Sequence, residues 1–83
     1  MTRDETLIRV FATQLKALRR DKRLSQEELA YRVGINRTYI AKLELGQNQP
    51  TLSVLYQLSK ELDYGDLKLI DSTIESYKRL QID

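Results

Sequence analysis

The chain of 83 residues contains no cysteine and no histidine, and these two absences remove much of the usual chemistry of protein sites. Without cysteine there is no disulfide and no thiolate metal site. Without histidine the commonest metal ligand and acid–base group is missing. There is also no Gly-rich phosphate loop, and the carboxylates are spread along helix faces or used in helix caps. The composition therefore predicts that the protein is not an enzyme and holds no metal and no cofactor.

Long hydrophobic runs are absent as well. No apolar run approaches the roughly 18 residues that a membrane span needs, and the N-terminus lacks a signal-peptide pattern. We therefore expect no membrane partner and a cytoplasmic location. The length suits one domain, residues 1–83, near the size at which a single core is only marginally stable alone.

The net charge is only +2, but the charge is unevenly distributed. Residues 1–50 carry ten Lys and Arg against six Asp and Glu, whereas residues 51–83 carry four against six. A basic half joined to a mildly acidic half is typical of a nucleic-acid binder. The basic cluster at residues 19–23 also has a second interpretation, because cations at the end of a helix stabilise that helix through its dipole.

The sequence is rich in helical periodicity. Apolar residues recur three and four positions apart over residues 4–22, and Pro50 with Thr51 precedes a second such stretch. A third stretch covers about residues 66–81. These patterns predict a first, a fourth and a fifth helix. The apolar face of the fourth is Leu52, Leu55, Leu58 and Leu62, and that of the fifth is Leu67, Ile70, Ile74, Tyr77 and Leu80.

Between these stretches the chain predicts two short helices joined by a tight turn. Ser25 followed by Glu28 is a capping box, so a helix begins at Gln26. Gly34 ends that helix because glycine accepts the left-handed conformation of a tight exit. Asn36 is a good N-cap for the next helix. This is the spacing of a helix-turn-helix, in which the second helix enters the DNA major groove.

The exposed face of that second helix indicates the chemistry. Arg37, Thr38 and Lys42 are left over once the apolar positions are assigned to the core. Arginine can donate two hydrogen bonds to guanine, threonine can meet a thymine methyl or a phosphate, and lysine suits guanine or phosphate. On an isolated helix these residues would be ordinary solvated polar groups. Their place after a capped helix and a glycine turn favours base reading.

The motif resembles that of a known family. It consists of Leu24-Ser25-Gln26-Glu27-Glu28-Leu29-Ala30, then Gly34, Ile40, Leu43-Glu44, Gly46 and Pro50. It is similar to the helix-turn-helix of the Cro and phage-repressor family, of the xenobiotic-response-element type, over about residues 8–66. This resemblance implies an all-α, five-helix, lambda-repressor-like DNA-binding domain with its helix-turn-helix at about residues 26–45. The segment 36–40 resembles the small controller proteins of restriction–modification systems.

The resemblance also implies roles for individual residues. Arg37, Thr38 and Lys42 match positions that read bases or adjacent phosphates. Arg19 and Glu44 match a pair that forms a buried salt bridge between the first and third helices. The positions expected to contact the DNA backbone are Gln26, Asn36, Tyr39, Gln47, Asn48 and Gln49.

The fifth helix is longer than the core of this family requires. It could simply cover the core, but its spare apolar surface predicts a homodimer formed through Ile70, Ile74, Tyr77 and Leu80. Two-fold symmetry lets two recognition helices reach successive major grooves of double-stranded DNA.

We therefore expect a dimeric, sequence-specific regulator of transcription. It binds a pseudo-palindromic operator, blocks or recruits RNA polymerase, and needs no small-molecule ligand. A restriction–modification controller is the favoured subtype, whereas a phage-type repressor or the antitoxin of a toxin–antitoxin pair fits the same residues. The fold can also serve as a protein-interaction module, but the basic side chains of Arg37 and Lys42 argue against that alternative.

Overall fold

A computed structural model describes residues 3–63 and 68–81, and the regular elements in these two ranges are five α-helices. They are α1 (Glu5–Asp21), α2 (Gln26–Val33), α3 (Arg37–Glu44), α4 (Leu52–Asp63) and α5 (Lys68–Gln81). The all-α prediction is confirmed, and the helix bounds agree with the sequence pattern to within a residue or two. The predicted fifth helix, about residues 66–81, includes residues 66 and 67, which lie outside the described ranges.

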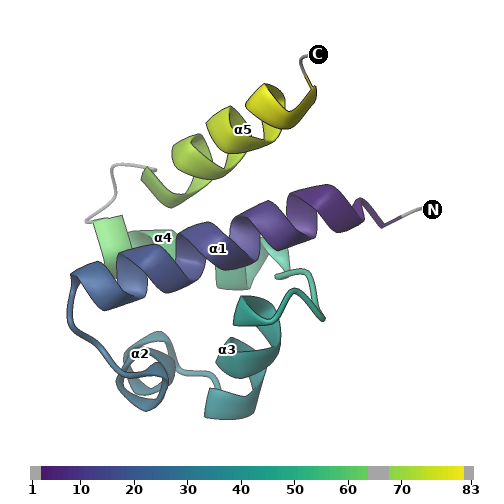
Figure 1. The fold of residues 1–83 in the computed structure, drawn as a ribbon. Coiled ribbons are helices and arrows are strands. Elements are labelled where there is room, and N and C mark those ends of the chain that lie inside the picture. The colour runs from purple at the N-terminus through teal and green to yellow at the C-terminus, as the bar shows by residue number, and fades with distance from the viewer. Residues whose placement is uncertain (1–2, 64–67, 82–83) are drawn as a thin grey trace.

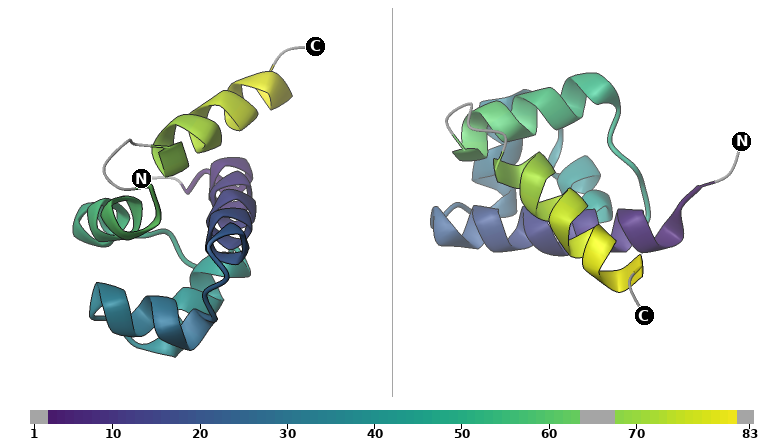
Figure 2. Two further views of the ribbon diagram at one scale, coloured as in Figure 1. Left: turned by 90° about the vertical axis from the view of Figure 1, so that its left-hand side faces the viewer. Right: turned by 90° about the horizontal axis from the view of Figure 1, so that it is seen from above.

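Helix α1 crosses the middle of the molecule (Figure 1). The pair α2 and α3 lies on one side of it and α5 lies on the other, while α4 runs behind α1 and contacts both α2 and α5 (Figures 1 and 2). The helix-turn-helix and the C-terminal helix therefore occupy opposite sides of the same central helix.

The core lies where α1, α2, α3 and α4 meet. Leu15, Leu29, Ile40 and Leu43 are fully buried there, and the small side chain of Ala30 on α2 is buried in the same cluster. The remaining members of this cluster are Phe11, Leu24, Leu58, Leu62 and Leu69. Burial of this set holds α3 in place while its polar side remains on the surface.

Two details of the predicted apolar faces are wrong. Leu52 stands at the start of α4 with 83% of its surface exposed, so the buried face of α4 is formed by Leu58, Ser59 and Leu62. In α5 the fully buried side is formed by Leu69 and Thr73, one position away from the predicted stripe. The periodicity identified both helices correctly, but it did not fix the rotation of each helix about its axis.

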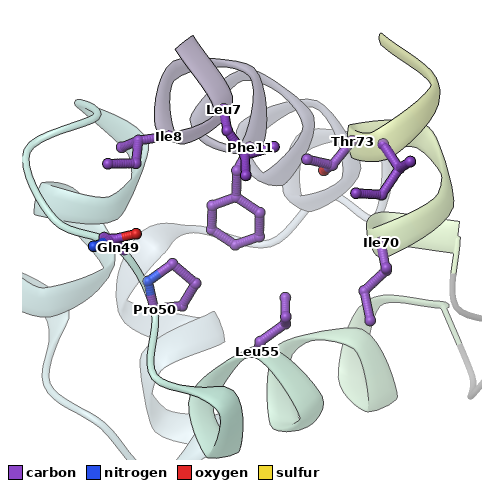
Figure 3. A pocket seen from close by; sticks show the side chains of 9 residues that line it. Leu7, Ile8, Phe11, Gln49, Pro50, Leu55, Ile70 and Thr73 are labelled. Atoms are coloured by element: carbon purple, nitrogen blue, oxygen red, sulfur yellow. The ribbon is translucent and has the colours of Figure 1, made fainter. Parts of the chain in front are cut away.

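An apolar pocket of about 210 Å³ opens at the junction of α1, α4 and α5. Phe11 projects from α1 toward Leu55 of α4 and Ile70 of α5 (Figure 3). The other residues that line it are Leu7, Ile8, Gln49, Pro50, Thr73 and Ile74. Within the described part of the chain, no helix is long and apolar enough to cross a membrane.

Candidate nucleic-acid interface

Helix α2 begins at Gln26 because of a complete capping box. The Ser25 hydroxyl accepts a hydrogen bond from the Glu28 backbone N–H at 3.0 Å, and a Glu28 carboxylate oxygen accepts one from the Ser25 backbone N–H at 2.8 Å. The Ser25 backbone N–H lowers the pKa of Glu28, so the carboxylate stays ionised at the positive end of the helix dipole. This end of α2 is thereby fixed in orientation.

A tight turn then sets the angle of α3. Gly34 adopts a left-handed conformation with φ +84°, which ends α2 as the sequence predicted. The side-chain oxygen of Asn36 accepts a hydrogen bond from the Tyr39 backbone N–H at 2.8 Å, so α3 begins at Arg37. The side-chain oxygen of Asn36 therefore serves the helix cap. The amide N–H groups of the same side chain are donors and can point toward a phosphate.

The two faces of α3 are sharply divided. Ile40 and Leu43 are fully buried, whereas Arg37, Thr38 and Lys42 are exposed. Tyr39 is half-buried and packs against the edge of the core. The structure therefore brings the three predicted base-reading side chains together on one surface of one short helix.

A buried ion pair links α3 to α1. The Arg19 guanidinium donates to both carboxylate oxygens of Glu44, at 2.6 and 2.9 Å, and a third N–H donates to the Leu24 carbonyl at 2.8 Å. Only 10% and 3% of the two side chains are exposed. Burial alone would raise the pKa of Glu44, but the hydrogen bonds from Arg19 and Gln26 outweigh it and lower that pKa, while Glu44 raises the pKa of Arg19. Both groups are charged at neutral pH.

Gln26, the expected phosphate ligand at the start of α2, is joined to this pair. Its side-chain amide donates to a carboxylate oxygen of Glu44 at 3.1 Å. The amide carries a second N–H that this bond does not use. Sequence spacing gave no signal for this contact, which connects the start of α2 with the end of α3.

The loop that follows α3 lies at the surface of the molecule. Gly46 has φ +74°, and the Gln47 backbone N–H donates to the Lys42 carbonyl at 3.0 Å. Gln47 and Gln49 are exposed and Asn48 is half-buried. The Gln47 carbonyl accepts a hydrogen bond from the Arg3 guanidinium at 3.0 Å, a contact between residues 44 positions apart that the sequence analysis missed.

The four residues predicted to form a dimer interface are distributed unequally along α5. Ile74 and Leu80 are 40% and 61% exposed, whereas Ile70 and Tyr77 are half-buried. The Tyr77 hydroxyl donates to the side chain of Asp4, the N-cap of α1. This hydrogen bond lowers the pKa of Asp4 and raises that of Tyr77. Tyr77 thus fastens α5 to α1 within one chain.

A capped two-helix unit that presents basic and polar side chains on its second helix defines a helix-turn-helix DNA-binding domain. The sequence profile of the helix-turn-helix family matches residues 15–69, well over half of the chain. The protein belongs to this family and is a helix-turn-helix transcriptional regulator of the xenobiotic-response-element type.

Several relatives are similar over most of this chain. The HTH-type transcriptional regulator y4dJ of Sinorhizobium fredii is 39% identical over 59 residues, which cover 71% of this chain and 77% of that protein. Control protein C.SmaI of Serratia marcescens is 38% identical over 61 residues, covering 74% and 73%. The restriction–modification controller C.Esp1396I, in a tetramer complex with its natural 35-base-pair operator, has a TM-score of 0.76 and 28% identity over 87% of this chain and 95% of that one.

Proposed function

We propose that the protein is a homodimeric controller-type regulator that reads a pseudo-palindromic operator through α3. The observation that carries this proposal is the exposure of Arg37, Thr38 and Lys42 on a helix whose other face is fully buried. A rigid helix with a fixed polar face can present the same three side chains to the same base edges at every encounter. This favours a DNA reader over a protein-interaction module.

Affinity and specificity come from different parts of this surface. Arg37 and Thr38 in the first turn of α3, with Lys42 one turn later, reach the base edges in the major groove. Phosphates are held around them by the free amide N–H groups of Gln26 and Asn36 and by Tyr39 and the loop of residues 47–49. Contacts of this second kind position the protein on the duplex and carry no sequence information directly.

Dimerisation through α5 supplies the second recognition helix. Ile74 and Leu80 are the exposed apolar side chains of this helix, and Ile70 and Ile74 line the apolar pocket beside it. A second copy packed on this surface would cover both. Because α5 lies across α1 from α3, a two-fold axis at α5 leaves both recognition helices free (Figure 1).

The controller subtype is supported by similarity to C.SmaI and to C.Esp1396I in its operator complex. A phage-type repressor or an antitoxin would use the same surface. The flanking genes separate these alternatives: a neighbouring methyltransferase or endonuclease gene supports the controller, whereas a neighbouring toxin gene supports the antitoxin. RNA polymerase, blocked or recruited at the promoter, is the further partner in each case.

Base reading is tested with Arg37→Ala on a site recovered by selection from random DNA. We expect this variant to lose about 1–3 kcal/mol of binding free energy and to relax the preference at one base position of each half-site. Binding is measured against single-base variants of the site. An equal loss of binding free energy on every sequence would show that Arg37 contacts a phosphate and does not read a base.

The dimer interface is tested by replacing its two exposed members, with Ile74→Glu and Leu80→Lys in one protein. Tyr77 is left intact because its hydroxyl supports the fold through Asp4. Sedimentation should show a folded monomer that binds the operator far more weakly, since the second half-site is no longer held at high effective concentration. The control is Tyr31→Lys, at a side chain 87% exposed on α2. If the parent protein is already monomeric, the proposed dimer interface on α5 is wrong.

A further inference from the structure

Arg3 precedes α1 and lies beside the loop that follows the recognition helix. One of its guanidinium N–H groups donates to the Gln47 carbonyl at 3.0 Å, and its Nε atom lies 3.1 Å from a carboxylate oxygen of Glu5. These contacts hold the side chain in one place although 45% of it is exposed. The N-terminal segment and the loop after α3 lie at the same end of the molecule (Figure 1).

The guanidinium retains unused hydrogen-bonding capacity. Arginine has five N–H donors. Its contacts with described residues, to Gln47 and Glu5, take one donor each and leave three. Arginine is also the side chain best suited to phosphate, since its planar donors can meet two oxygens at once. The position of Arg3 therefore combines a cation held by two contacts, N–H donors that no described residue uses, and a neighbouring loop whose Gln47 and Gln49 are exposed.

The Gln47 contact also determines where the loop lies. A carbonyl that accepts from Arg3 points toward the N-terminal segment, so the backbone of residues 47 and 48 is fixed relative to α1. Gly46 lies against the same helix, because a Cβ atom built on it would be 3.9 Å from the Cα of Arg9. The loop is thereby held on α1 from two points.

We propose that Arg3 is a further DNA-backbone contact, in which its guanidinium holds the loop through Gln47 and donates to a phosphate beside that loop. The inference rests on the proposed approach of residues 47–49 to the DNA backbone. Glu5 limits the strength of the contact, because its carboxylate lies next to the same guanidinium and opposes a second anion. We assign no base specificity to Arg3, because the loss of a phosphate contact weakens DNA binding about equally on every sequence.

The test compares Arg3→Ala with the parent protein on a short mixed-sequence DNA duplex, with affinity measured over a series of salt concentrations. The slope of log K against log salt is negative, and each phosphate contact that is lost reduces its magnitude by about 0.9. We expect that reduction for each subunit bound, together with weaker binding at low salt. Arg3→Lys keeps the charge and should retain most of the slope. Glu5→Gln should tighten binding, because it removes the competing carboxylate.

The matched control is Arg79→Ala, which removes an arginine from an exposed ion pair with Glu75 on α5. That pair lies across α1 from the recognition helix, so the slope should equal that of the parent. If the parent binds DNA and Arg3→Ala shows the same salt dependence of affinity as the parent, the proposed phosphate contact of Arg3 is wrong. This holds even if the affinity of the variant falls because the loop has moved. If the parent itself shows no salt-dependent DNA binding, the proposed function fails instead.

Discussion

A buried charge pair ties α3 to α1, in addition to the apolar contacts of Ile40 and Leu43. Arg19 and Glu44 share two hydrogen bonds, and Glu44 also accepts from Gln26 at the start of α2. One carboxylate therefore connects α1, α2 and the end of α3. The pair was expected from the family resemblance, but the link through Gln26 is visible only in three dimensions.

Loss of Glu44 should be costly because it strands the Arg19 charge in the core. We expect Glu44→Ala to lower the free energy of unfolding by about 3–5 kcal/mol, and the double change Arg19→Met with Glu44→Leu to cost less. Urea unfolding measures both. Glu75→Ala, which breaks an exposed pair on α5, should change stability by less than about 1 kcal/mol. Equal stability of Glu44→Ala and the parent would contradict the role given to this pair.

Ser59 presents the opposite case, a buried polar atom that no described residue binds. Its side chain on α4 is 2% exposed, and its hydroxyl has no hydrogen-bond partner among the described residues. We expect Ser59→Ala to stabilise the protein by about 1 kcal/mol, because it removes an unsatisfied group and introduces a better helix former. Thermal unfolding followed by circular dichroism measures the change. A lower melting temperature would mean that the hydroxyl is satisfied in solution.

At the scale of helices, the ends were the most predictable feature. Ser25, Gly34 and Asn36 each act through a local rule that operates within four residues, so the sequence alone placed the ends of α2 and the start of α3. The buried faces of α4 and α5 were less predictable. Whether Leu52 or Leu69 is covered depends on which helices pack around it, and apolar spacing carries no information about that.

The turn between α2 and α3 offers a clean test of backbone conformation. Gly34 has φ +84°, and a Cβ atom there would meet nothing within 4 Å. Gly34→Ala should therefore cost only the strain of a left-handed alanine, about 1–2 kcal/mol, and Gly34→Asn should cost less. Chemical unfolding of the two variants gives the comparison. An alanine variant as stable as the parent would show that the turn relaxes to another conformation.

Contacts between distant segments were beyond prediction for a different reason. Arg3 meets Gln47, and Tyr77 meets Asp4, across separations of 44 and 73 residues. No local pattern specifies such pairs, because they depend on the final packing of α1 against α3 and α5. The candidate DNA-reading residues were accessible from sequence since they all lie within one short helix and its flanking caps.

For the whole molecule, three carboxylates make stability depend on pH: Asp4 and Glu44 link different helices, and Glu28 caps α2. Asp4, Glu28 and Glu44 all have a lowered pKa in the folded state. The unfolded chain therefore binds more protons than the folded one in acid, and stability falls as pH decreases from about 5. Urea unfolding between neutral pH and pH 3 should show this trend, with a shallower dependence for Asp4→Asn, which keeps the cap. An unchanged profile in that variant would exclude the Asp4 contribution.

The molecule as a whole separates two surfaces on opposite sides of α1. Figure 2 shows α3 on one side of α1 and α5 on the other. Helix α3 carries exposed basic and polar residues, and α5 carries the exposed apolar residues Ile74 and Leu80. This division is compatible with the proposal that α3 contacts DNA while α5 contacts a second copy of the chain. The charge of the sequence is also uneven: residues 1–50, which contain α1, α2 and α3, are basic, and residues 51–83, which contain α4 and α5, are mildly acidic.

The most direct test of sequence-specific DNA reading is selection of bound sites from a pool of random duplexes with the purified protein, followed by sequencing of the recovered DNA. We expect enrichment of two inverted half-sites about one helical turn apart, because a two-fold dimer places its recognition helices in successive major grooves. The same selection with Arg37→Ala should recover sites with one base position per half-site relaxed. Recovery of DNA with no shared sequence, although the protein is folded and binds the pool, would contradict sequence-specific reading of DNA by α3.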